Sequence, residues 1–212
     1  MQDSTQFSIV VAGAMNPKIH HPTWYRQAKI LTKREEAFAI KSQMVCVSEL
    51  AQFTTERFGV TCDQTKWLVQ TPNLSLVKLL KVVAIKVFDR LPETPLTACG
   101  INVDYHIETE TDNVGSKIGR AIASSNLGLV TVRGEEVAGR IVFSRSTNQR
   151  KYNIVVEQSL KAKNGIFITV NVHYDLHTRS YGRFKEKLNQ YLNRDIRMVD
   201  LIKNQVLSSF RK

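Results

Sequence analysis

The sequence predicts an α+β fold with a largely antiparallel sheet, a few packed helices and an amphipathic helical tail at the C-terminus. Strand-like segments come in runs that few helical segments interrupt, which is typical of this class. Residues 97–110 alternate apolar and polar side chains, as a half-buried strand does. Residues 183–210 carry an apolar stripe at helical spacing. We find no internal sequence repeat and expect a single domain over residues 1–212, with candidate subregions 1–110 and 125–212.

The first half of the chain contains four short strand patterns and two helical ones. Segments 7–14 and 44–47 are apolar strand patterns, and segments 53–60 and 66–70 look like further strands, with Gly59 and Asp63-Gln64 at turns. Pro22 suits the first turn of a short helix. Residues 73–91 predict the clearest helix, and Pro92 follows its end. We interpret the lysines on the polar side of this helix as a solvated face: Lys78, Lys81 and Lys86.

The second half predicts a meander of strands that ends in a helical tail. A short helix is expected over residues 114–124. Four strands follow, at residues 127–133, 137–145, 151–158 and 166–176, and Asn164-Gly165 is a strong turn signal before the last of them. The tail over residues 183–210 is amphipathic, and we expect Asn193-Arg194-Asp195 to break it into two helices.

The net charge of +11 is distributed unevenly along the chain. Residues 1–110 contain 12 Lys+Arg and 11 Asp+Glu, whereas residues 111–212 contain 18 and 8. Such an asymmetry favours a polyanionic partner, most simply nucleic acid, either DNA or RNA. The hydrophobic and charged fractions, 42% and 23%, are ordinary for a globular protein.

Several function classes lack their sequence signals. No phosphate-binding glycine loop, nucleophile motif or metal-ligand spacing is present, so we expect no cofactor and no metal and favour a non-enzymatic role. The three cysteines are far apart and odd in number, which indicates buried thiols in a reducing compartment. Without a signal peptide pattern or a long apolar run, we expect a cytoplasmic protein with no membrane contact.

Nucleic-acid binding is the leading functional hypothesis. Cations lie near the predicted strand ends and hairpin tip, and cations interleave with an aromatic residue before the tail helix. Lysine and arginine neutralise phosphates, while Tyr181 is a candidate for stacking on an unpaired base. The candidate residues are Arg140, Arg145, Lys161, Lys163, Arg179, Tyr181, Arg183, Lys185 and Lys187.

Two alternatives remain open. Asp104, His106 and Glu108 lie on the polar face of one predicted strand and are residue types that hold a divalent cation, so a metal-dependent nuclease or hydrolase is the catalytic alternative. The third hypothesis is a purely structural assembly subunit, whose interface with a protein partner is formed by the sheet edge and the tail helix and whose charge serves only solubility. A homo-oligomer or a larger complex is expected under the leading hypothesis as well.

Two segments resemble other proteins. They are Asn16-Pro-Lys-Ile-His-His-Pro-Thr-Trp-Tyr25 and Phe88-Asp-Arg-Leu-Pro-Glu-Thr-Pro-Leu-Thr-Ala-Cys-Gly-Ile-Asn102. Both resemble patterns in sporadically distributed, uncharacterised bacterial proteins of about this length. The resemblance implies a bacterial origin and, by analogy, a place in a mobile-element or defence complex. It implies no activity that transfers to particular residues.

Overall fold

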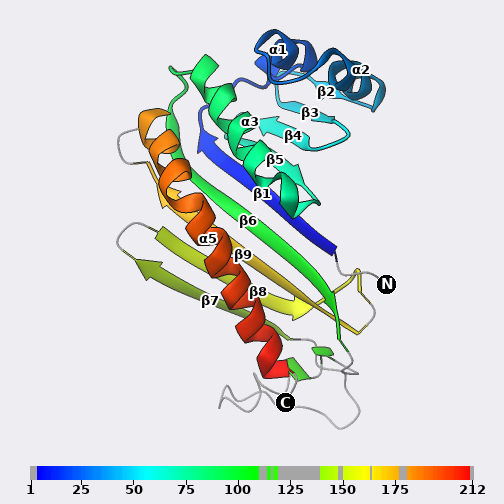
Figure 1. Cartoon of the computed structure of the whole chain (residues 1–212), viewed down its shortest axis with the longest axis vertical. Helices are drawn as coiled ribbons and strands as arrows, with labels where there is room; N and C mark the ends of the chain where they lie inside the picture. Colours follow the sequence, from blue (N-terminus) through cyan, green and yellow to red (C-terminus); the bar gives the residue numbers. More distant parts are fainter. Residues whose placement is uncertain are drawn as a thin grey trace. The chain divides into compact units, whose positions relative to one another are not determined.

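The structure is a computed structural model that describes residues 4–109, 114–115, 117–118, 139–147, 150–162, 164–176 and 181–210. Its strands form a nine-stranded antiparallel sheet in the order β2-β3-β4-β5-β1-β6-β9-β8-β7 (Figure 1). With the helices that pack on this sheet, the arrangement confirms the predicted α+β class. The strands are β1 (Ser4–Gly13), β2 (Val45–Cys46), β3 (Leu50–Thr54), β4 (Gly59–Asp63), β5 (Lys66–Thr71), β6 (Leu96–Glu108), β7 (Arg140–Thr147), β8 (Arg150–Gln158) and β9 (Gly165–Asp175). The described helices are η1 (Pro17–Ile19), α1 (Pro22–Gln27), α2 (Lys33–Lys41), η2 (Leu74–Leu76), α3 (Val77–Arg90) and α5 (Tyr181–Phe210).

The order of elements repeats although the sequence does not. In the first series, strand β1 is followed, after α1, α2 and β2, by strands β3, β4 and β5 and then by helix α3. From β6 to α5, one strand is followed by β7, β8 and β9 and then by a helix. Within the sheet, the first strand of each series lies beside the last one, giving β3-β4-β5-β1 and β7-β8-β9-β6. The fold therefore uses the same strand order twice.

Two elements of the first half differ from the prediction. Residues 53–60 are not one strand, because a turn lies between the end of β3 and Gly59 at the start of β4. The Thr55 hydroxyl donates to the Phe58 carbonyl at 2.8 Å and accepts from the Phe58 amide at 3.0 Å, and these bonds fix the turn. Helix α2 is absent from the prediction, because its apolar residues form only a weak helical pattern. It begins with a capping box in which Thr32 and Glu35 exchange hydrogen bonds.

The tail is one uninterrupted helix, so the predicted break at residues 193–195 is wrong. Asp195 is fully buried, its carboxylate lies 2.5 Å from Arg150, and it accepts a hydrogen bond from the Tyr152 hydroxyl at 2.8 Å. Burial raises the pKa of Asp195, while the Tyr152 hydroxyl and the Arg150 guanidinium oppose this rise. Aspartate often ends a helix, but Asp195 is buried inside α5 and links this helix to Arg150 and Tyr152 of β8.

The rest of the second half agrees with the prediction where it is described. Strands β7, β8 and β9 occupy three of the predicted meander strands, and β7 pairs antiparallel with β8 from Arg140↔Glu157 to Thr147↔Arg150. Of the predicted helix over residues 114–124, the structure describes 114–115 and 117–118, which are helical. The predicted strand over residues 127–133 lies outside the described residues.

The chain divides into two compact units that interleave along the sequence. Unit 1 comprises Met1–Thr5, Val103–Asn171 and Arg194–Lys212, and unit 2 comprises Gln6–Asn102 and Val172–Asn193. Strands β6 and β9 and helix α5 contribute residues to both units. The expectation of one domain with subregions 1–110 and 125–212 stays a prediction.

Unit 2 has an aromatic core. Trp67 packs edge-on against Phe88 at 5.4 Å, and Phe88 packs against Phe184 of α5 at 5.3 Å, measured between ring centroids. The Tyr25 hydroxyl accepts from Trp67 Nε1 at 2.8 Å and lies 2.9 Å from Nδ1 of the buried His20. These contacts join α1, α3 and the beginning of α5 to the strands of unit 2.

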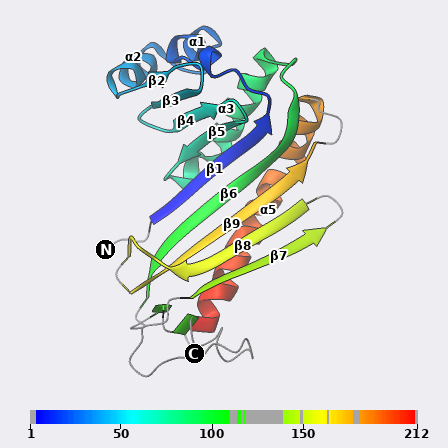
Figure 2. The same ribbon diagram turned by 180° about the vertical axis from the view of Figure 1, so that it is seen from behind.

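Unit 1 has an aliphatic core on one side of its strands. Figure 2 shows β6, β9, β8 and β7 in front of α5, which lies behind them. The side chains that alternate toward the helix are buried: Val103, Tyr105, Tyr152, Ile154, Val156, Ile166, Ile168 and Val170. The Tyr105 hydroxyl donates to Asp200 of α5 at 3.0 Å, so the helix contacts β6 there and β8 at Asp195.

Candidate functional site

Helices α3 and α5 lie side by side in unit 2 (Figure 1). The ring contact between Phe88 and Phe184 holds the two helices together. The Tyr181 hydroxyl donates to the Asp89 carboxylate and lies 3.4 Å from the Ile85 carbonyl oxygen. The apolar stripes of both helices are thus used for packing, and their polar stripes remain at the surface of unit 2.

The polar stripes of these two helices are strongly basic. Within α3 and the first thirteen residues of α5, the acidic residues are Asp89 and Glu186. We call the basic residues of this pair of helices the two-helix basic face: Lys78, Lys81, Lys86, Arg90, Arg183, Lys185 and Lys187. Seven cations against two anions give the two-helix basic face a formal charge of +5.

Ion pairing neutralises little of this charge. Lys185 Nζ lies 3.5 Å from Asp89, and Arg183 lies 3.6 Å from Glu186, with all four side chains about half exposed. Such solvent-exposed pairs contribute about 0–1 kcal/mol and break easily when a stronger anion approaches. In the described part of the chain, Lys78 and Lys81 form no ion pair with a carboxylate. Lys86 Nζ donates to the Lys29 carbonyl oxygen at 3.2 Å. The other cations of the two-helix basic face are therefore available to an external polyanion.

The structure gives Tyr181 a packing role that the sequence does not reveal. Burial and the hydrogen bond to Asp89 raise its pKa, so the hydroxyl stays protonated and bound. The Lys185 ammonium lies 5.7 Å from the centre of its ring, and the Phe184 ring lies 6.2 Å away. These contacts favour Tyr181 as a link between the helices over a stacking platform for a base.

The remaining predicted nucleic-acid residues lie apart from this face or outside the described chain. Arg140 and Arg145 are exposed on β7 in unit 1, and Arg140 lies 3.5 Å from Glu157. Lys161 is exposed in the turn between β8 and β9. Lys163 and Arg179 lie outside the described residues. The predicted set thus divides between the two units.

The residues of the catalytic alternative make structural contacts. His106 Nδ1 lies 2.9 Å from the Ser159 hydroxyl, and its ring stacks on Phe167 at 4.6 Å. Burial and the Lys161 cation lower the pKa of His106, and Asp104 opposes this shift. Among the described residues, no group of three or more His, Cys, Asp or Glu side chains could hold a metal ion, so Asp104, His106 and Glu108 receive no support as a metal centre.

The charge asymmetry of the sequence does not follow the two units. Unit 2 carries 16 Lys+Arg and 9 Asp+Glu, and unit 1 carries 14 and 10. This redistribution arises mainly because four carboxylates of residues 1–110 belong to unit 1, namely Asp3, Asp104, Glu108 and Glu110. A smaller part arises because the beginning of α5, with its cations, packs in unit 2 beside α3. Sequence reasoning missed Lys78 and Lys81 as candidates, because nothing in one sequence indicates that two distant helices share a face.

No protein-family model matches the chain, and no curated protein matches it. In the described part of the chain, no helix combines the length and the apolar character that crossing a membrane requires. The candidate site therefore rests on the geometry of the chain itself.

Proposed function

We propose that this protein is a non-enzymatic binding and assembly subunit that contacts nucleic acid through the two-helix basic face of unit 2. The observation that supports the proposal is the concentration of seven cations and two anions on a pair of adjoining helices. Cations in such an array release the counterions of a phosphate backbone, which is the main source of sequence-independent affinity.

The proposed contact is with the phosphate backbone and not with the bases. Lysines make up five of the seven cations, and lysine acts on phosphate as a point charge, without the planar fork that reads a guanine edge. The aromatic residue of the face, Tyr181, is bound to Asp89. We therefore expect similar affinities for sequences of the same length and strandedness.

The proposed setting is a complex in a bacterial cytoplasm, as the resemblance and the cysteine pattern predict. Cys46, Cys62 and Cys99 are free thiols, and burial raises the pKa of Cys62 and Cys99 to about 12. Thiols with such pKa values are poor nucleophiles, which supports a structural role for both residues.

A salt series with matched variants tests the proposal. Labelled duplex and single-stranded DNA and RNA are titrated with wild-type protein and with the triple variant Lys78→Gln, Lys81→Gln, Lys185→Gln. The control variant, Lys18→Gln, Lys33→Gln, Lys41→Gln, makes the same change in net charge elsewhere in unit 2, where these lysines are exposed.

The face variant should bind more weakly and with a flatter dependence on salt. Each lost phosphate contact on duplex DNA reduces the slope of log affinity against log salt by about 0.9, so three lost contacts reduce it by about 2 to 3. The control variant should keep the wild-type slope. Equal losses in both variants would attribute binding to net charge, and undetectable wild-type binding at low salt would reject the proposal.

A further inference from the structure

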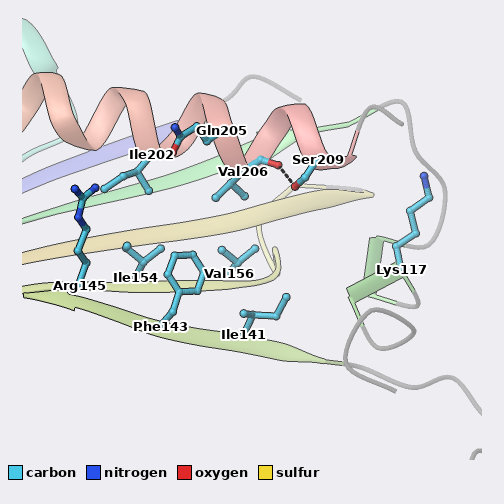
Figure 3. A pocket seen from close by; sticks show the side chains of 10 residues that line it. All are labelled: Lys117, Ile141, Phe143, Arg145, Ile154, Val156, Ile202, Gln205, Val206 and Ser209. Atoms are coloured by element: carbon cyan, nitrogen blue, oxygen red, sulfur yellow. Dashed lines mark hydrogen bonds between the residues drawn. The ribbon is translucent and has the colours of Figure 1, made fainter. Parts of the chain in front are cut away.

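Unit 1 contains an apolar groove that the proposed nucleic-acid contact does not use. The groove has a volume of about 720 Å³ and lies between strands β7 and β8 and the end of α5 (Figure 3). We call it the β7–α5 groove, and its lining is Lys117, Ile141, Phe143, Arg145, Ile154, Val156, Ile202, Gln205, Val206 and Ser209.

Cross-strand pairs build the floor of the groove. Ile141 pairs with Val156, and Phe143 pairs with Ile154, so apolar side chains from β7 and β8 adjoin on the side of the sheet that α5 covers. Ile154 and Val156 are buried, whereas the Phe143 residue is 43% exposed. Exposing an aromatic ring on an edge strand is costly in water, and covering it is a source of binding free energy.

The path of α5 leaves this groove open. The helix contacts β8 at Asp195 and β6 at Asp200, whose carboxylate accepts from Tyr105. Its last turns line the groove on the side opposite β7, through Ile202, Val206 and Ser209. Four strands at about 4.8 Å spacing span about 19 Å, whereas one helix with its side chains is about 10–12 Å wide. Among the described residues, about 7–9 Å of this width over β8 and β7 is thus left uncovered by α5, so a second helix seated there would also extend past the β7 edge of the sheet.

The charge of the groove lining determines which kind of helix would bind there. Arg145 and Lys117 are the charged residues of the lining, and the lining contains no acidic residue. The described helices α1, α2, α3 and α5 of this chain each contain more basic than acidic residues. A helix from a second copy would therefore bring cations toward cations, while an acidic helix would complement the rim.

We propose that the β7–α5 groove binds an acidic amphipathic helix of a partner protein. The apolar face of that helix covers Phe143, Ile141 and Val206, and its carboxylates meet Arg145 and Lys117. This is the helix-in-groove mode of recognition, in which apolar anchors recur every three to four residues. The proposal uses residues of unit 1 and is independent of the two-helix basic face.

Two designed peptides of about 16 residues probe the groove. One carries leucines at helical spacing with glutamates elsewhere, and the other replaces every glutamate by lysine. Fluorescence anisotropy with the full-length protein measures both affinities. The variants are Phe143→Ser and Arg145→Glu, and the matched control is Val142→Ser. Val142 is 60% exposed and adjoins Phe143 on the other side of the strand, and it does not line the groove.

The acidic peptide should bind at least about tenfold more tightly than the basic one. Phe143→Ser and Arg145→Glu should each weaken binding by about tenfold, because both change groove contacts, and Val142→Ser should leave it unchanged. A photo-crosslinker at position 143 should label the peptide, whereas one at position 142 should not. The proposal would be overturned if neither peptide bound, if both bound with equal affinity, or if Val142→Ser weakened binding as much as Phe143→Ser. A concentration-dependent homodimer that Phe143→Ser dissociates would also overturn it. DNA binding by the same variants should stay at the wild-type level, which separates this proposal from the nucleic-acid one.

Discussion

Acidification should destabilise unit 2 by protonating His20. This residue is 2% exposed, and its Nδ1 lies 2.9 Å from the Tyr25 hydroxyl. Since that hydroxyl accepts from Trp67 Nε1, its own hydrogen is available to a neutral imidazole nitrogen. A proton on Nδ1 would remove this acceptor and place an unpaired charge in the core. Burial accordingly lowers the pKa of His20 from 6.5 to about 4.

The size of the effect follows from the pKa difference. Between pH 6.5 and about 4, the unfolded chain binds a proton at His20 that the folded chain does not bind. The free energy of unfolding therefore falls by about 1.4 kcal/mol for each pH unit on acidification through this interval. The total contribution of His20 is about 3 kcal/mol, fully present above pH 6.5 and lost as the pH approaches 4.

Urea unfolding followed by tryptophan fluorescence measures this contribution. The Trp24 ring lies 5.9 Å from His20, and Trp67 bonds to the same tyrosine, so both fluorophores report on unit 2. His20→Asn keeps an acceptor near the hydroxyl and cannot titrate, so its stability should fall less with acid than that of wild type. His21→Asn serves as the control for the same substitution at the neighbouring, less buried position. Parallel stability curves for wild type and His20→Asn between pH 6.5 and 4 would refute the reasoning.

Two further predictions concern stability. Asp195→Ala removes the carboxylate that pairs with the buried Arg150 guanidinium, so it should lower the free energy of unfolding by about 3–5 kcal/mol. Asp200→Ala, at a half-exposed site, should cost less. Urea midpoints compare the two variants, and equal costs would contradict the anchor role of Asp195. Gly100→Ala would put a Cβ atom 2.4 Å from the Val172 carbonyl oxygen, so it should lower the melting temperature. In the control Gly182→Ala, the added Cβ atom meets no atom within 4 Å, so the melting temperature should not change. An unchanged melting temperature for Gly100→Ala would contradict the close approach of the two strands.

The alternation of side chains made most of the sheet predictable. Ile101, Val103 and Tyr105 are buried as the strand pattern requires, and β8 and β9 lie within about one residue of their predicted bounds. The turn before Gly59 was hidden, because its residues Thr55, Glu56 and Arg57 include no glycine, proline, asparagine or aspartate to signal a turn. The uninterrupted α5 was also hidden, because the buried partners of Asp195 come from a distant strand.

The candidate site was predictable only in part, for a physical reason. Arg183, Lys185 and Lys187 can be recognised from the sequence alone, because they are basic, adjacent in the chain and at the start of the predicted tail helix. The cations that complete the face, such as Lys78 and Lys81, are about a hundred residues away along the chain. Tertiary packing of Phe88 on Phe184 unites them, and no local pattern encodes that contact.

The most direct test of the nucleic-acid proposal is the salt dependence of duplex DNA binding by wild type and the Lys78→Gln, Lys81→Gln, Lys185→Gln variant. We expect the slope of log affinity against log salt to become smaller by about 2 to 3 in this variant. The Lys18→Gln, Lys33→Gln, Lys41→Gln variant should keep the wild-type slope. Identical slopes for wild type and both variants would contradict a phosphate-binding role for the two-helix basic face.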